Sequence, residues 1–174
     1  MVEKAANHGP LHIRDALPDE VDEVSAIMLA AYSEYASSLT PEGWEAYASN
    51  ITDVRGRLGE SELIVAERNG AIVGAVTFYP DSSRTKVEGW PSGYSGVRLL
   101  SVQPEAQGHG VARALMSECI RRARERGVSY VGLHTTELMS IARGMYERMG
   151  FRRIPEFDWE PLPGRLVMAY QLQL

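Results

Sequence analysis

Two glycines stand where an apolar stretch gives way to a run of residues that could form a helix. Residues 103–116 read QPEAQGHGVARALM and contain Gly108 and Gly110. The first turn of a helix has backbone N–H groups without partners inside the helix, and the helix dipole adds positive charge there. Glycines just before that turn lack Cβ atoms, so an anion can approach these amides closely. The spacing therefore predicts either a phosphate-binding loop or a tight strand-to-helix turn.

Two widespread nucleotide-binding loops do not fit this stretch. The dinucleotide-binding pattern GxGxxG/A would need a small third residue at position 113, and that residue is Arg113. The P-loop pattern GxxxxGK(S/T) does not occur anywhere in the chain.

The elements that would position the two glycines follow from the spacing of apolar residues. Short apolar or alternating runs predict strands at 11–16, 61–68, 71–80, 97–104, 128–136, 151–160 and 165–174. Helical periodicity predicts helices at 18–35, 40–58, 111–126 and 137–150. Thr40 is placed to cap the second helix, Asn69-Gly70 favours a tight hairpin, and Gly127 stops the third helix. This order predicts one sheet with helices on its faces.

Two motifs in this order resemble the GCN5-related N-acetyltransferase (GNAT) superfamily. QGHGVA, at residues 107–112, matches the pattern Q/R-x-x-G-x-G/A of that family. Downstream, ARGMYERMGF at residues 142–151 resembles its second signature, in which a helix carries a tyrosine shortly before a Gly-Phe pair. The resemblance implies an α/β (α+β) fold: a mixed, mostly antiparallel sheet of about six or seven strands with a splayed central parallel pair, flanked by about four helices.

The resemblance also implies that acetyl-CoA is the co-substrate. Backbone amides of the glycine loop (residues 107–112) would bind the pyrophosphate of CoA, and main-chain groups of the preceding strand would line its pantetheine arm. Amides near Leu100 and Val102 could also polarise the acyl carbonyl. The implied cofactor-binding residues are Leu100, Ser101, Val102, Gln107, Gly108, His109, Gly110, Val111 and Ala112.

Acyl transfer from a thioester to an amine also needs a proton donor for the thiolate and a base for the amine. The resemblance implies that Tyr146 is the donor, while an ordinary core tyrosine is the alternative. The carboxylate that family members often carry before the loop is missing from GVRLLSV at residues 96–102. His134 is the predicted base because histidine titrates near neutral pH. Two kinds of alternative stay open: a structural role for His134, and deprotonation of the amine through Glu34, Glu88 or a water relay. Met139 occupies the place where many members carry an asparagine that contacts CoA.

Composition limits the remaining possibilities. The length predicts one domain, and the resemblance implies that it is an acetyltransferase domain at 11–174 after a polar lead-in at 1–10. Cys119 is the only cysteine and the histidines lack metal spacing, so we expect neither a disulfide nor a metal site. The net charge is −5, but one basic segment, 98–153, has ten arginines against five acidic residues. We therefore expect no nucleic-acid partner.

No apolar run could span a bilayer and no secretion signal is visible, which favours a cytoplasmic protein without a membrane partner.

The favoured interpretation is an N-acetyltransferase that moves an acetyl group from acetyl-CoA to a primary amine of a small molecule or peptide. The amine would attack directly in a ternary complex, without a metal. A homodimer is left open. Two alternatives remain: a regulatory module that binds CoA without catalysis, and an acyltransferase that uses another acyl-CoA or a hydroxyl acceptor.

Overall fold

The computed structural model describes residues 9–85, 89–161 and 163–174. Most of the predicted lead-in and Glu88 therefore lie outside the described residues. The chain divides into two compact units, one made of residues 1–77 and 99–118 and the other of residues 78–98 and 119–174. The boundaries run through strands and a helix, so each unit is built from segments that are distant in sequence.

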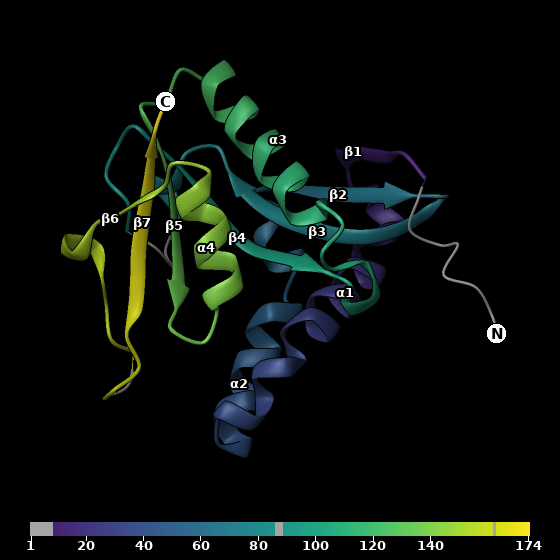
Figure 1. Cartoon of the computed structure of the whole chain (residues 1–174), viewed down its shortest axis with the longest axis horizontal. Helices are drawn as coiled ribbons and strands as arrows, with labels where there is room; N and C mark the ends of the chain where they lie inside the picture. The colour runs from purple at the N-terminus through teal and green to yellow at the C-terminus, as the bar shows by residue number, and fades with distance from the viewer. Residues whose placement is uncertain (1–8, 86–88, 162) are drawn as a thin grey trace. The chain divides into compact units, whose positions relative to one another are not determined.

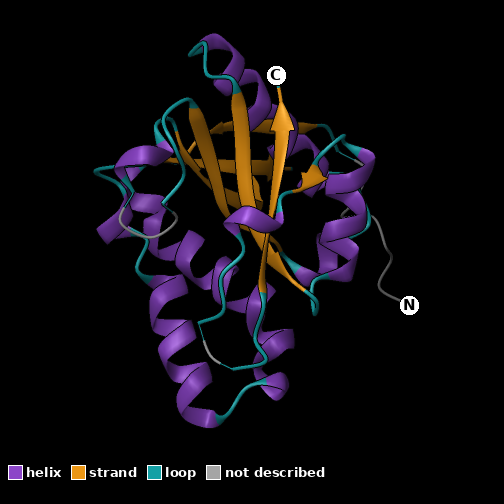
Figure 2. Ribbon diagram, turned by 90° about the vertical axis from the view of Figure 1, so that its left-hand side faces the viewer, coloured by secondary structure: helices purple, strands orange, loops and turns teal. Residues whose placement is uncertain are grey.

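Helices and strands follow one another in the order β1-α1-α2-β2-β3-β4-α3-β5-α4-β6-β7 (Figures 1 and 2). The described residues form seven strands, in the sheet order β1-β2-β3-β4-β5-β7-β6. Their bounds are β1 Leu11–Asp15, β2 Glu62–Arg68, β3 Ala71–Tyr79, β4 Tyr94–Val102, β5 Tyr130–Thr136, β6 Arg152–Arg153 and β7 Val167–Gln173. The helices are α1 Val21–Tyr32, α2 Pro41–Thr52, α3 Val111–Glu125 and α4 Ser140–Arg148. β4 and β5 pair in parallel, whereas β1–β2, β5–β7 and β6–β7 are antiparallel. The predicted mixed α/β fold is confirmed.

The first unit is organised around the hairpin of β2 and β3. Both turn residues have positive φ, 54° at Asn69 and 78° at Gly70, as a tight hairpin of this sequence requires. β1 lies antiparallel beside β2, with Leu11 opposite Arg68. α1 and α2 pack against each other (Figure 1). The predicted cap of α2 is confirmed, because the Thr40 hydroxyl oxygen accepts from the Gly43 N–H at 3.1 Å.

Both N-terminal helices are shorter than the sequence predicts. The stretch predicted as one helix at 18–35 is divided into a 3₁₀ turn at Pro18–Glu20, then α1, then another 3₁₀ turn at Ser33–Ser38. α2 ends at Thr52 instead of continuing to residue 58, and a short 3₁₀ turn follows at Arg55–Arg57. Apolar periodicity does not distinguish α-helical from 3₁₀ turns at helix ends, which explains the difference.

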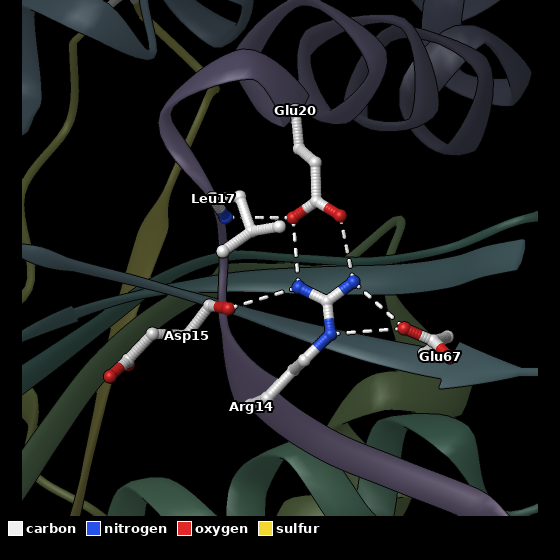
Figure 3. A network of polar contacts seen from close by, with 5 residues as sticks. All are labelled: Arg14, Asp15, Leu17, Glu20 and Glu67. Atoms are coloured by element: carbon white, nitrogen blue, oxygen red, sulfur yellow. Dashed lines mark hydrogen bonds and ion pairs between the residues drawn. The ribbon is translucent and has the colours of Figure 1, made fainter. Parts of the chain in front are cut away.

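An ion-pair network joins β1, β2 and the start of α1 (Figure 3). The Arg14 guanidinium donates to both carboxylate oxygens of Glu20, at 2.8 and 2.7 Å, and to Glu67 at 3.0 and 2.8 Å. Glu20 also accepts from the Leu17 backbone N–H at 2.7 Å. These bonds, chiefly those from Arg14, lower the pKa of Glu20 to about 2.

We expect Glu20→Gln to lower the free energy of unfolding at pH 7 by about 1–2 kcal/mol, between the values typical of exposed and buried ion pairs. Because the folded pKa is depressed, this contribution is present above the ordinary glutamate pKa of about 4.3 and is lost as the pH falls toward 2. Urea unfolding from pH 7 down to pH 3 should show the difference between the two proteins shrinking. Asp22→Asn is the control, since its pair with Arg55 is exposed. A difference that is constant over this pH range would contradict the assignment.

The second unit is built on β5, which pairs with β7 from Tyr130 to Thr136. Its aromatic core is centred on Trp90, which is only 2% exposed and stacks on Tyr94 with ring centroids 5.1 Å apart. A Cβ at Gly132 of β5 would lie 2.6 Å from the indole. Only a glycine at this position lets the Trp90 ring lie directly on the strand.

The strand predicted at 151–160 is much shorter in the structure. β6 contains only Arg152 and Arg153, and a 3₁₀ turn follows at Pro155–Phe157. The reason is Pro155, which has no N–H to donate to a strand ladder. Asp158 fixes the turn by accepting from Arg153 at 2.6 and 2.7 Å and from the Ala169 backbone N–H at 2.8 Å.

Candidate functional site

The glycine loop leads from β4 through a 3₁₀ turn at Pro104–Ala106 into α3. Gly108 and Gly110 have φ of 77° and 79°, a region that side-chain-bearing residues rarely adopt. A Cβ placed on either glycine would meet no atom within 4 Å. The glycines are therefore needed for the backbone path, while the space beside them is open to a ligand. Both sequence interpretations of these glycines are compatible with this geometry.

Hydrogen bonds within the loop orient its peptide groups. The His109 ring nitrogen Nδ1 lies 2.7 Å from the Gln107 carbonyl oxygen, to which it can donate. The Gly110 carbonyl accepts from Ala114 N at 3.0 Å, as the residue preceding a helix does. The amides of Val111, Ala112 and the next residue, Arg113, consequently have no partner inside α3. Residues 107–110 are exposed, so this end of α3 can receive an anion.

Gly74 on β3 allows the start of α3 to lie close to the sheet. A Cβ at this position would lie 2.8 Å from Val111 Cγ1 and 2.9 Å from the Ser101 carbonyl oxygen. Glycine is thus required where α3 and β4 both approach β3. Gly74 was not among the predicted site residues, although a glycine inside a strand pattern is a known signal of close backbone approach.

β4 changes its conformation before it reaches the glycine loop. Its parallel register with β5 extends from Tyr94 to Val97 and ends there in the part of the chain that the structure describes, although β4 itself continues to Val102. Leu99 has a φ of 54°, which is unusual and strained for a branched side chain. The predicted splay of the parallel pair is confirmed by this early end of the pairing.

The three residues of β4 predicted to line the cofactor follow Leu99 directly. The Leu100 carbonyl oxygen accepts from the Tyr32 hydroxyl at 3.4 Å. The Ser101 side chain is buried, and its hydroxyl donates to the Leu99 carbonyl at 2.9 Å. Val102 is also buried. Tyr32 on α1 was not predicted as a neighbour of this strand, because no local pattern connects residues so distant in sequence.

Tyr146 belongs to the second unit and is buried on α4, with 7% of its surface exposed. The chain leaves α4 through Gly150, whose φ is 95°, and Phe151 then donates its N–H to the Tyr146 carbonyl at 3.0 Å. The two rings lie 5.8 Å apart between centroids. The Gly-Phe pair of the second motif thus turns the chain back against the tyrosine. This contact explains the spacing of the motif and leaves the chemical role of Tyr146 as a prediction.

His134 on β5 lies within the aromatic core of the second unit. Its Nε2 is 3.0 Å from the Phe157 carbonyl oxygen, and its ring centroid is 4.8 Å from that of Trp90. A carbonyl only accepts, so Nε2 carries the hydrogen and Nδ1 is the basic nitrogen of the neutral ring. The structure therefore gives His134 a structural contact, which was the alternative to its predicted role as base. The base role remains a prediction.

The first unit also carries a row of aromatic side chains from α1, the turn after it and α2. Tyr32 contacts Tyr35 and Tyr47 edge-on, with centroids 6.0 and 6.1 Å apart, and Trp44 contacts Tyr47 at 6.3 Å. Burial, assisted by the neighbouring Glu34 carboxylate, raises the pKa of Tyr35 to about 12. The Tyr35 hydroxyl therefore stays protonated at neutral pH.

Within the described ranges, no group of three or more His, Cys, Asp or Glu side chains could hold a metal ion. The same residues include no helix long and apolar enough to cross a membrane.

Comparison with known proteins adds independent findings. The family model of the acetyltransferase (GNAT) family matches residues 26–151. A probable N-acetyltransferase, family 8 member 5, from Mus musculus is 36% identical over 96 residues, covering 54% of this chain and 40% of that protein. A mycothiol acetyltransferase from Cellulomonas flavigena is 32% identical over 107 residues, covering 58% of this chain and 31% of that protein. The chain therefore spans less than half the length of these curated relatives.

A solved structure gives a further match. The crystal structure of a GNAT family acetyltransferase from Brucella melitensis, in complex with acetyl-CoA, aligns with a TM-score of 0.62 and 25% identity. The alignment covers 83% of this chain and 84% of that one.

Proposed function

Because this chain belongs to the acetyltransferase (GNAT) family, we propose that it transfers an acetyl group from acetyl-CoA to a primary amine of a small molecule or peptide. The observation that carries the proposal is the glycine loop. Two open, left-handed glycines precede the N-terminus of α3, and amides without helical partners follow. This is the arrangement that an extended diphosphate requires.

The residues proposed to hold the co-substrate lie in the first unit. Amides of residues 107–112 would bind the two phosphates of the CoA pyrophosphate, assisted by the dipole of α3. Main-chain groups of Leu100, Ser101 and Val102 would bind the two amides of the pantetheine arm, as a strand binds a short peptide. Bound acetyl-CoA supplies the acetyl group as a thioester.

The proposed reaction forms one bond and breaks one. The nitrogen of the neutral amine bonds to the thioester carbonyl carbon, and the carbon–sulfur bond breaks. Amides near Leu100 and Val102 would stabilise the negative charge that develops on the carbonyl oxygen. Tyr146 would donate its hydroxyl proton to the departing sulfur, and the amine proton would pass to His134 or to a water chain.

A panel of amines with acetyl-CoA, followed by detection of the released thiol, tests the proposal. We expect at least one class of amine to raise thiol release well above the rate without acceptor. Parallel reactions with hydroxyl acceptors and with longer acyl-CoA molecules test the other acyltransferase reactions. Tight CoA binding without thiol release for any acceptor would instead indicate a CoA-binding module.

We predict that His134→Gln removes the acidic limb of the pH dependence of kcat/KM. The glutamine amide can still donate to the Phe157 carbonyl, which His134 approaches at 3.0 Å, but it cannot take up a proton near neutral pH. If His134 is the base, the rate should also fall by about 10²-fold or more. Steady-state rates between pH 5 and pH 9 provide the measurement. A variant that keeps the wild-type limb would leave His134 with its structural role alone.

A further inference from the structure

Arg68, the last residue of β2, is a buried arginine without a carboxylate partner among the described residues. Only 7% of its surface is exposed. Its Nη2 donates to the carbonyl oxygen of His109 in the glycine loop at 3.4 Å, while Nε and Nη1 are buried without hydrogen-bond partners. Arginine is rarely buried unless its charge is paired. The adjacent Glu67 does not pair with it, since its carboxylate binds Arg14.

The bond from Arg68 determines which way an amide of the loop points. In a trans peptide the carbonyl of one residue and the N–H of the next point in opposite directions, and the chain has no cis peptide bonds in its described part. Because the His109 carbonyl is directed to Arg68, the Gly110 N–H is directed away from it. The contact between the His109 ring and the Gln107 carbonyl has the same effect on the Gly108 N–H. Arg68 therefore orients the Gly110 amide from outside the loop, and the His109 ring orients the Gly108 amide from within it.

The charge of Arg68 adds to this effect. The guanidinium contacts the loop at the N-terminus of α3, where the helix dipole is also positive. Two positive sources thus lie at the same end of α3. An anion at the loop would be attracted by both.

We propose that Arg68 is a positioning residue for the glycine loop. Arg68 orients the Gly110 amide and supplies a buried positive charge for a diphosphate-bearing acyl donor. The inference rests on the proposed function, because it takes the diphosphate of CoA as the ligand. Arg68 acts through the loop, since its buried nitrogens are not open to the ligand. Its removal should therefore affect phosphate-bearing donors selectively.

Calorimetric titration with CoA, and kinetics with acetyl-CoA and S-acetylpantetheine, test this role in Arg68→Met and Arg68→Lys. S-acetylpantetheine carries the same thioester without phosphates. We expect Arg68→Met to weaken CoA binding by at least about tenfold, as loss of a hydrogen bond with a charged group does. The KM for S-acetylpantetheine should be unchanged. Arg68→Lys, which keeps the charge, should lie between wild type and Arg68→Met. Arg55→Met is the matched control, since it removes an exposed arginine of the same unit.

The outcomes separate the inference from the proposed function. Wild-type protein that binds no CoA would overturn both. If the wild-type protein binds CoA and folded Arg68→Met binds it with equal affinity, only the inference is overturned. Equal losses of activity with acetyl-CoA and with S-acetylpantetheine in Arg68→Met would also overturn only the inference. Hydrogen exchange of the ligand-free proteins gives a readout without CoA: the amides of residues 108–111 should exchange faster in Arg68→Lys than in wild type. Unchanged exchange there would also count against the inference, even if Arg68→Met fails to fold.

Discussion

Gly110→Glu should weaken CoA binding by at least about a hundredfold while the chain stays folded. The φ of 79° disfavours any side chain by about 1–2 kcal/mol, and the new carboxylate repels the pyrophosphate that the loop is proposed to bind. The Cβ itself would meet no atom within 4 Å, so the substitution should not disturb packing. Calorimetric titration with CoA, together with circular dichroism, measures both effects.

Gly127→Glu is the matched control for this experiment. Gly127 follows the other end of α3, has a φ of 68° and likewise has open space around its Cβ position. The same strain and charge at that end should leave CoA affinity at the wild-type value. Gly110→Ala separates strain from charge and should have an intermediate effect. Wild-type affinity in Gly110→Glu would refute the loop as the phosphate site.

Tyr146→Phe should lower kcat and kcat/KM together by about tenfold to a hundredfold, with unchanged CoA affinity. The substitution removes only the hydroxyl, and the ring can keep its contact with Phe151. A general acid acts mainly in the transition state, so ground-state binding should not change. CoA thiolate is a fairly good leaving group, which places the expected effect at the low end of general acid catalysis. Steady-state kinetics with the best amine of the panel provides the test.

Tyr170→Phe controls for the loss of a hydroxyl from the same unit. The Tyr170 hydroxyl donates to Glu147 on α4 at 3.0 Å, so its removal perturbs the same helix without the proposed chemistry. We expect its kcat to remain within about threefold of wild type, as for the loss of a partly buried hydrogen bond worth about 0.5 kcal/mol. If Tyr146→Phe behaves like this control, Tyr146 is a core residue and the proton donor must be sought elsewhere.

Most of the fold could be predicted from short-range signals in the sequence. Asn69-Gly70 specifies a turn through backbone preferences of two residues, and Thr40 specifies a cap through one side-chain bond, so neither depends on distant contacts. The strand predicted at 151–160 was too long, because the apolar residues of this stretch do not reveal the effect of Pro155. In the chain, the missing N–H of Pro155 and the ion pair of Arg153 with Asp158 produce a turn instead.

Only those residues of the candidate site that lie in a recognisable motif could be predicted from the sequence. The glycines of the loop follow from their position before a helix, and their positive φ angles agree with that expectation. No local sequence pattern indicates which residues orient the loop. Arg68 reaches His109 across 41 positions, and Gly74 meets Ser101 and Val111 through strand pairing and helix packing. An arginine at the end of a strand pattern is ordinarily exposed, so its burial could be recognised only from the folded chain.

The contact between Gly132 and Trp90 has a consequence for sequence divergence among related chains. A side chain at position 132 and the indole of Trp90 would occupy the same space, since a methyl group on residue 132 would lie 2.6 Å from the indole. A substitution at either position alone therefore leaves an overlap or a void. Relatives that carry a larger residue in place of Gly132 should carry a smaller one in place of Trp90. The pair is thus expected to covary across descendants of a common ancestor, even though 42 positions separate them along the chain.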